Sequence, residues 1–190
     1  MIKISDLTYT PLFCEENIWK FLDYCQTDNT IKPRDVIFII NPDKAIALFD
    51  QKLSQENEPV IWDYHVILSA TYEQQTVIFD FDSRRPFPDL ISNYFNRTFL
   101  SWSLLPEKLR PFLRIINATH FYKHFSSDRS HMLGLITDDK FPEYETISPE
   151  KHIEPLYLQD CFNISSESIK ELSTPEFYLQ QVLNNHPISD

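Results

Sequence analysis

The stretch PVIWDYHVILSATYEQQTVIFDFDS, residues 59–83, holds the two patterns that decide the fold. Residues 60–70 and 76–82 are rich in β-branched and aromatic side chains, which is typical of strands. The segment between them, residues 72–75, is polar and is typical of a turn. We therefore predict a β-hairpin with one strand over 60–70 and its partner over 76–82.

Outside this hairpin the chain alternates between helical and strand patterns. Apolar residues at helical spacing predict a helix over 15–25, and its first turn carries Glu15 and Glu16, which suit the positive end of the helix dipole. Residues 36–40 are wholly apolar and indicate a short buried strand. The other predicted elements are helices over 90–104, 166–172 and 175–183, and a strand or helix start over 113–118. We expect an α/β (α+β) fold in one domain, residues 1–190, with a mostly antiparallel sheet flanked by helices.

The composition excludes several common functions. Gly134 is the single glycine, whereas Walker phosphate loops, GxGxxG turns and GxSxG elbows all need glycines where the backbone turns tightly. The net charge of −11 repels phosphate groups, which argues against nucleic acids and anionic membranes as partners. No apolar run reaches the roughly 20 residues of a membrane helix. We therefore expect a protein of the cytoplasm.

Cys14 comes immediately before the predicted helix, where its thiol has a reason to ionise. Unpaired N–H groups and the helix dipole stabilise a thiolate there, although Glu15 and Glu16 oppose it unless they turn outward or an imidazolium balances them. An inert buried cysteine is the alternative, because free cysteine behaves as a small hydrophobic residue. We assign this inert role to Cys25 and Cys161, since no CxxC spacing suggests a disulfide framework or a zinc site.

His65 lies within an apolar strand pattern and therefore needs a polar partner. Alternation along the strand places Trp62 on one face and His65 on the other, while the next strand carries Asp80 and Asp82 on a common face. A turn centred on residues 72–73 sets His65 across from Asp80, whereas a turn one residue further on sets it across from Asp82. Cysteine, histidine and aspartate are the nucleophile, base and orienting group of a thiol enzyme. A core histidine with a satisfied hydrogen bond is the alternative.

His120 and His124 stand four residues apart, a spacing that places two imidazoles on one helical face for zinc. Their segment, HFYKH, lacks the glutamate of the HExxH motif, and no cysteine nearby completes a ligand set. We interpret it as a partly exposed amphipathic element, and we expect neither a metal nor another cofactor.

Four motifs resemble the protein N-terminal glutamine amidohydrolase family. They are CEENIWK at 14–20, PVIWDYHV at 59–66, FDFDSRRPFP at 79–88 and FSSDRSHM at 125–132. The motifs follow one another in the family's order, and WDYH and SDRSHM are the most specific of them.

The resemblance implies a catalytic triad of Cys14, His65 and Asp80, and it alone favours Asp80 over Asp82. It implies a thiol fold of the papain and transglutaminase type and hydrolysis of the side-chain amide of an N-terminal glutamine through a cysteine thioester. The oxyanion is then expected to meet backbone N–H groups at the helix start. The implied partners are proteins or peptides with a free N-terminal glutamine, and a monomer would act on them in the N-degron pathway of the cytoplasm and nucleus.

Selection of an N-terminal residue requires an acceptor for the α-ammonium group, and the sequence offers several. The candidate substrate-binding residues are Glu16, Asp63, Asp82, Asp128 and Ser130. The run from Asp128 to Ser130 also fits a helix cap with a local ion pair. Two other functions stay open: a thiol transferase or deamidase that acts on internal glutamine, and an inactive homologue that binds Gln-initiated chains.

Overall fold

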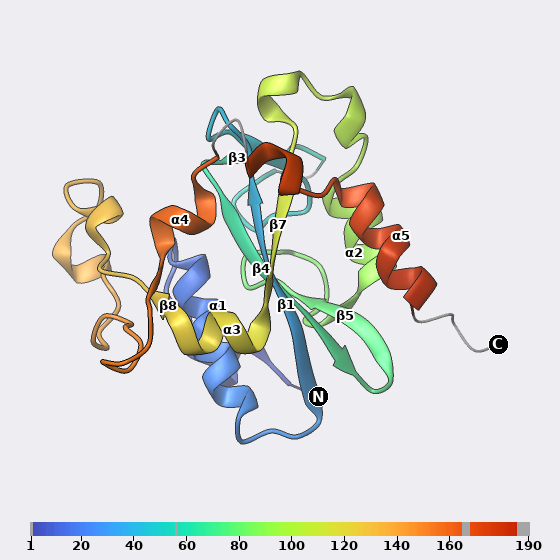
Figure 1. Cartoon of the computed structure of the whole chain (residues 1–190). Coiled ribbons are helices and arrows are strands. Elements are labelled where there is room, and N and C mark those ends of the chain that lie inside the picture. The colour runs from blue at the N-terminus through green and yellow to red at the C-terminus, as the bar shows by residue number, and fades with distance from the viewer. Residues whose placement is uncertain (1, 56, 165–167, 186–190) are drawn as a thin grey trace.

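The computed structural model describes residues 2–55, 57–164 and 168–185, and its centre is a five-stranded antiparallel sheet (Figure 1). The strand order is β6-β5-β4-β1-β7. The strands are β1 (Ile31–Ile40), β4 (His65–Tyr72), β5 (Gln75–Phe79), β6 (Asp89–Leu90) and β7 (Phe112–Asn117). Two small sheets flank it: β2 (Ile46–Leu48) pairs antiparallel with β3 (Val60–Trp62), and β8 (Phe125–Ser126) pairs parallel with β9 (Leu156–Tyr157).

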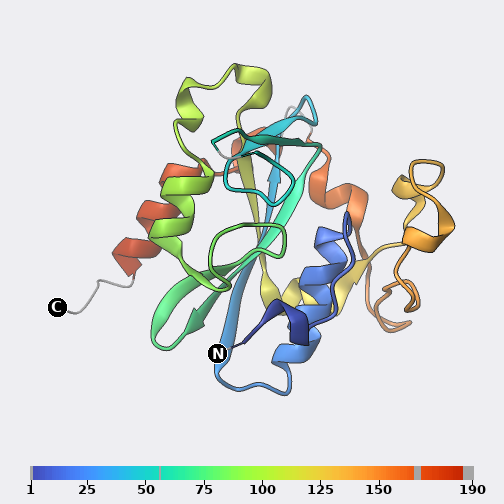
Figure 2. The same ribbon diagram turned by 180° about the vertical axis from the view of Figure 1, so that it is seen from behind.

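Helices cover both faces of the central sheet (Figure 2). One face packs against α1 (Cys14–Cys25), α3 (Ala118–His124) and α4 (Leu158–Phe162), and the other against α2 (Ile91–Thr98) and α5 (Pro175–Asn185). The 3-10 helices are η1 (Ile4–Asp6), η2 (Trp102–Leu104), η3 (Glu107–Leu109), η4 (Ser130–Met132), η5 (Asp138–Lys140) and η6 (Ser168–Glu171). The predicted α/β domain with a mostly antiparallel sheet and flanking helices is confirmed.

The continuous apolar run in β1 is explained by the helices that cover both faces of the sheet. Val36 and Phe38 belong to the core beneath α1 and α3, whereas Ile37 and Ile39 belong to the core beneath α2 and α5. Because successive side chains of a strand point to opposite faces, a strand covered on both sides needs apolar residues at every position. The predicted strand at 36–40 is therefore confirmed as the end of β1.

The predicted helices are confirmed where apolar residues recur clearly at helical spacing. Those over 15–25 and 175–183 correspond to α1 and α5, whereas the helix predicted over 90–104 ends at Thr98. The left-handed φ of 52° at Ser101 interrupts it before η2. The ambiguous segment 113–118 contains the end of a strand and the start of a helix, because the Asn117 side chain accepts hydrogen bonds from two backbone N–H groups of α3.

Two further predictions need comment. The helix predicted over 166–172 falls partly on residues 166 and 167, which lie outside the described residues, and the described remainder contains η6. The strand predicted over 60–70 is confirmed at 60–62 and 65–70 but is not continuous, because the chain leaves one sheet after Trp62 and enters another at His65. Within the described ranges no helix is long and apolar enough to span a membrane.

The hairpin of β4 and β5 is confirmed, with a turn one residue later than residues 72–73. Tyr72 pairs with Gln75, and the two turn residues Glu73 and Gln74 have φ values of 49° and 65°. Positive φ at both central positions is the conformation that suits a two-residue hairpin turn. The strand predicted over 76–82 stops at Phe79, which frees the chain that follows to turn toward β4.

Candidate active site

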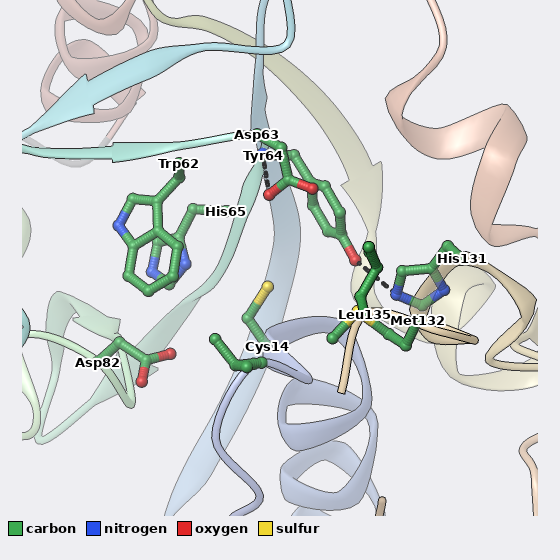
Figure 3. Close-up of a pocket in the computed structure, with 10 residues that line it drawn as sticks. Cys14, Trp62, Asp63, Tyr64, His65, Asp82, His131, Met132 and Leu135 are labelled. Carbon is green, nitrogen blue, oxygen red and sulfur yellow. Dashed lines mark hydrogen bonds between the residues drawn. The ribbon is translucent and has the colours of Figure 1, made fainter. Parts of the chain in front are cut away.

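A cavity of about 190 Å³ opens beside the first turn of α1 (Figure 3). Its wall comes from the start of α1, the junction of β3 with β4, the chain after β5, and the segment around η4. We call the following residues the cavity wall: Leu12, Cys14, Trp62, Asp63, Tyr64, His65, Asp82, His131, Met132 and Leu135. Cavities of about 150 Å³ hold a benzene molecule, so this volume accepts a single side chain.

Cys14 is the first residue of α1, and its Sγ atom points into the cavity (Figure 3). Burial raises the pKa of the thiol well above its usual range, and the carboxylates of Glu15 and Asp82 raise it further. The sequence predicts ionisation of Cys14 only if Glu15 and Glu16 turn outward or an imidazolium balances them, and they do not turn outward. Both glutamates are fully buried, and the Glu15 carboxylate is the one of the two that raises the pKa of Cys14.

His65 forms a buried ion pair with Asp80, with 2.8 Å between Nε2 and Oδ1. Burial lowers the pKa of His65, but the charge and hydrogen bond of Asp80, together with the charges of Asp82 and Glu15, outweigh burial, so the pKa is raised overall. Burial raises the pKa of Asp80, yet His65 and the hydrogen bond from Tyr94 outweigh it, and the pKa is lowered. Both shifts stabilise the imidazolium that forms when a neutral His65 accepts a proton beside the Asp80 carboxylate.

The partner of His65 is Asp80 and not Asp82, and the position at which β5 ends is the reason. The last pair of the β4–β5 ladder is Leu68 with Phe79, and the same register continued would set His65 opposite Asp82. Because β5 ends at Phe79, Asp80 leaves the ladder and its side chain reaches the histidine. Asp82 instead accepts a 2.6 Å hydrogen bond from the Tyr9 hydroxyl, and its backbone N–H donates to Asp80.

The second ring nitrogen of His65, Nδ1, is buried and has no hydrogen-bond partner among the described residues. With Nε2 donating to the ionised Asp80, Nδ1 is the basic nitrogen. The ring stacks on Trp62, with centroids 5.4 Å apart and planes at 14°. This contact corrects the prediction that Trp62 and His65 lie on opposite faces, and its cause is the break between β3 and β4.

One group of three possible metal ligands occurs in the described chain: His65, Asp80 and Asp82, whose ligand atoms lie within 4.8 Å of one another. Hydrogen bonds between these residues and with two tyrosines account for this proximity. His120 and His124 stack on each other at 4.2 Å, and His124 Nδ1 lies 2.9 Å from the carbonyl oxygen of Glu154. This hydrogen bond engages Nδ1 and leaves Nε2 open, but the ligand group found in the described chain does not include His120 or His124.

Sequence reasoning missed the environment of Glu15. Its Oε2 atom lies 3.5 Å from Cys14 Sγ and accepts a 3.0 Å hydrogen bond from the Tyr64 hydroxyl. His131 Nε2 lies 3.4 Å from that hydroxyl and 3.7 Å from Glu15 Oε1. Position 15 shares a helical face with Ile18 and the apolar residues beyond it, and this spacing was the signal for a buried carboxyl group.

Glu16, a candidate for substrate binding, is engaged elsewhere. Arg129 donates from Nε to Oε1 at 3.0 Å and from Nη2 to Oε2 at 2.9 Å. Arg129 also donates to the carbonyl oxygens of Pro142 and Glu145. The buried pair therefore ties α1 to the segment that carries His131 into the cavity wall, and breaking such a pair costs about 3–5 kcal/mol.

The other four candidates divide into two pairs. Asp63 and Asp82 belong to the cavity wall. Asp128 and Ser130 are exposed and lie outside it, and Asp128 accepts a 2.9 Å hydrogen bond from the Ser130 backbone N–H. This contact spans two residues and is a local turn. The helix-cap alternative for the Asp128–Ser130 run is wrong, because Arg129 is the N-cap of η4, no side chain of the described residues caps this helix, and Arg129 pairs with distant Glu16.

The sequence of this chain is similar to those of known proteins. Residues 9–184 match a family model described as N-terminal glutamine amidase. Proteins named protein N-terminal glutamine amidohydrolase are similar: that of Danio rerio is 40% identical over 131 residues, which is 67% of this chain and 65% of the relative. That of Homo sapiens is 37% identical over 127 residues, 65% of this chain and 62% of the relative. That of Drosophila melanogaster is 36% identical over 138 residues, 68% of this chain and 65% of the relative. In each case the matched part spans just under two thirds of the relative's length.

Proposed function

Because the chain belongs to the N-terminal glutamine amidase family, we propose that it hydrolyses the side-chain amide of N-terminal glutamine in proteins and peptides. The products are N-terminal glutamate and ammonia. The observation that carries the proposal is a buried thiol and a histidine that share one cavity, with an aspartate hydrogen-bonded to Nε2 of that histidine. This is the arrangement of nucleophile, base and orienting group in thiol hydrolases.

The first half of the reaction forms a thioester. His65 Nδ1 takes the proton of the Cys14 thiol, and the resulting thiolate attacks the carboxamide carbon of the substrate. The imidazolium, which Asp80 stabilises, then gives this proton to the amide nitrogen. The carbon–nitrogen bond breaks, ammonia leaves, and a γ-glutamyl thioester remains on Cys14.

The second half consumes one water molecule. His65 takes a proton from the water as its oxygen attacks the thioester carbon, and the carbon–sulfur bond then breaks. The departing Cys14 sulfur recovers a proton from His65, and the product is the free acid. In both halves the oxyanion forms beside the first backbone N–H groups of α1, including that of Cys14, which have no intrahelical partners at a helix start.

The α-ammonium group of the substrate needs an anionic partner in the cavity wall, and Asp63 is suited to this role. One of its oxygens accepts the Tyr64 backbone N–H at 2.9 Å, which orients the carboxylate (Figure 3). Asp63 is exposed, so a charged amine reaches it without full desolvation. Asp82, the other aspartate of the wall, is buried and already accepts the Tyr9 hydroxyl.

This function predicts strict selection for a free N-terminal glutamine. Incubation at substoichiometric protein should convert a Gln-initiated peptide to the Glu-initiated form, a gain of about one mass unit by mass spectrometry, with release of ammonia. The N-acetylated peptide and a peptide with internal glutamine should remain unchanged, because each leaves the amine acceptor unpaired. Equal turnover of internal glutamine would point to the thiol transferase or deamidase, and binding without turnover to the inactive homologue.

The role of Asp63 predicts a selective loss of affinity. Asp63→Asn should lower kcat/KM for Gln-initiated peptides about tenfold or more, mainly through KM, because asparagine keeps the hydrogen bond from Tyr64 but loses the charge. Steady-state kinetics of ammonia release measure the effect. Asp128→Asn is the matched control, since it removes an acidic charge outside the cavity wall and retains an acceptor for Ser130. Equal effects of the two variants would assign the amine to another group.

We further propose that the protein acts without a cofactor, as a monomer of the cytoplasm and nucleus in the N-degron pathway. The three cysteines are free in the described structure, which suits a reducing compartment.

A further inference from the structure

The acidic residue Glu15 contacts the proposed nucleophile, Cys14, and neither half of the reaction above uses it. The carboxyl group of Glu15 is fully buried, and its Oε2 atom lies 3.5 Å from Cys14 Sγ. The Tyr64 hydroxyl approaches the same oxygen, while Oε1 has no hydrogen-bond partner within the described chain. A buried carboxyl group with one free oxygen beside a reactive sulfur calls for a chemical explanation.

The charges around Glu15 do not favour its ionised form. Arg129, the nearby buried cation, is bound to Glu16. His131 Nε2 lies within ion-pair distance of Oε1, at 3.7 Å, but burial lowers the pKa of His131 and so disfavours its cationic form. Burial raises the pKa of Glu15 to about 7, and Glu16 also raises it, whereas the hydrogen bonds from Tyr64 and Cys14 lower it. The titratable or charged groups that face Glu15 are Cys14 and Glu16 on α1, Tyr64 and His65 at the start of β4, His131 on η4 and Cys161 on α4.

We propose that Glu15 works as a protonated carboxyl group that permits Cys14 to ionise, so that loss of this proton switches the nucleophile off. The inference rests on the proposed function for its purpose, but it concerns the free protein. When His65 takes the thiol proton, a protonated Glu15 donates its own hydrogen from Oε2 to the thiolate. An ionised Glu15 would instead place two negative charges 3.5 Å apart in a buried site, which opposes the thiolate strongly.

The proton count gives the direction of the pH effect. The active form carries one proton on Glu15 and one on each ring nitrogen of His65, and none on Cys14. Because the protonated form of Glu15 is the active one, reactivity is present below the pKa of about 7 and falls as the pH rises through it. Glutamine has the shape of a protonated glutamate and cannot lose the proton, so Glu15→Gln should remove this fall.

The experiment measures the alkylation rate of Cys14 by iodoacetamide between about pH 5.5 and about pH 8.5, with mass spectrometry to separate it from Cys25 and Cys161. Relative to the unmodified protein, Glu15→Gln should react at least tenfold faster at about pH 8.5 and at a similar rate at about pH 5.5. Glu107→Gln is the matched control because its side chain is exposed, and it should follow the unmodified protein at every pH. Identical profiles for Glu15→Gln and the control would overturn the proposal.

Two features keep the test decisive. If Glu15→Gln fails to fold, infrared spectroscopy of the unmodified protein replaces it: a protonated-carboxyl band should vanish as the pH rises through about 7 and should shift when Cys14 is alkylated. A protein without such a band contradicts the inference. Alkylation needs no substrate, so an absence of ammonia release from every glutamine peptide, with the Glu15→Gln effect intact, would refute the proposed function alone.

Discussion

Replacement of Cys14 by alanine is expected to abolish the release of ammonia from Gln-initiated peptides. In the proposed reaction the Cys14 thiol is the nucleophile, and it shares the cavity wall with its proposed base, His65. Without it the reaction loses its nucleophile, and the loss of a nucleophile from a catalytic triad lowers kcat by at least about a thousandfold. Ammonia release and the mass of the peptide measure the loss directly.

Cys25→Ala is the control for this variant. Cys25 is a buried cysteine on the same helix and belongs to the core packed against the sheet, outside the cavity wall. Its replacement should reduce stability modestly and leave kcat near that of the unmodified protein. Thermal unfolding of both variants separates lost folding from lost chemistry. Near-normal turnover by Cys14→Ala would refute the thioester route.

Asp80→Asn is expected to lower kcat by about 10³–10⁴-fold, with a much smaller effect on KM. Asp80 Oδ1 lies 2.8 Å from His65 Nε2 and fixes the tautomer that leaves Nδ1 basic. An asparagine amide at this place can donate to Nε2 instead, which moves the hydrogen to Nδ1 and removes the base from the cavity. The raised pKa of His65 should also fall, because the carboxylate that causes it is gone.

Two measurements check the assignment of Asp80. The kinetics should show the loss in kcat, and an NMR titration of the His65 ring should show a lower pKa. Asp139→Asn, at an exposed aspartate on η5, should change neither. If Asp80→Asn stays within tenfold of the unmodified protein while Asp82→Asn loses most activity, the orienting role belongs to Asp82.

Local patterns predicted a large part of this molecule. The helix that begins at Cys14 follows from apolar residues at helical spacing, and the hairpin follows from two β-rich runs around a polar turn. This helix and this hairpin depend on residues that are close together in the chain, so both can be predicted from the local sequence. The pairing of His65 with an acidic residue also follows from the need of a buried histidine for a partner.

The identity of that partner did not follow from the same pattern. Spacing left Asp80 and Asp82 open, and the observed register continued past Phe79 would have favoured Asp82. The end of β5 decides for Asp80, together with the Tyr94 hydroxyl that donates to Asp80 at 2.7 Å. The split of one predicted strand into β3 and β4 likewise depends on β2, a distant segment that pairs with β3.

From its sequence alone this chain is assigned a fold class, a family resemblance and a nucleophile at a helix start, because periodicity and motifs are local properties. Only the tertiary structure decided which carboxyl groups are free to act. Glu16 is bound by Arg129 from a segment 113 residues away, and Glu15 lies buried against the nucleophile beneath Tyr64. The charge of a carboxyl group depends on water and on neighbours brought together by folding, and these are set by packing between segments far apart in the chain.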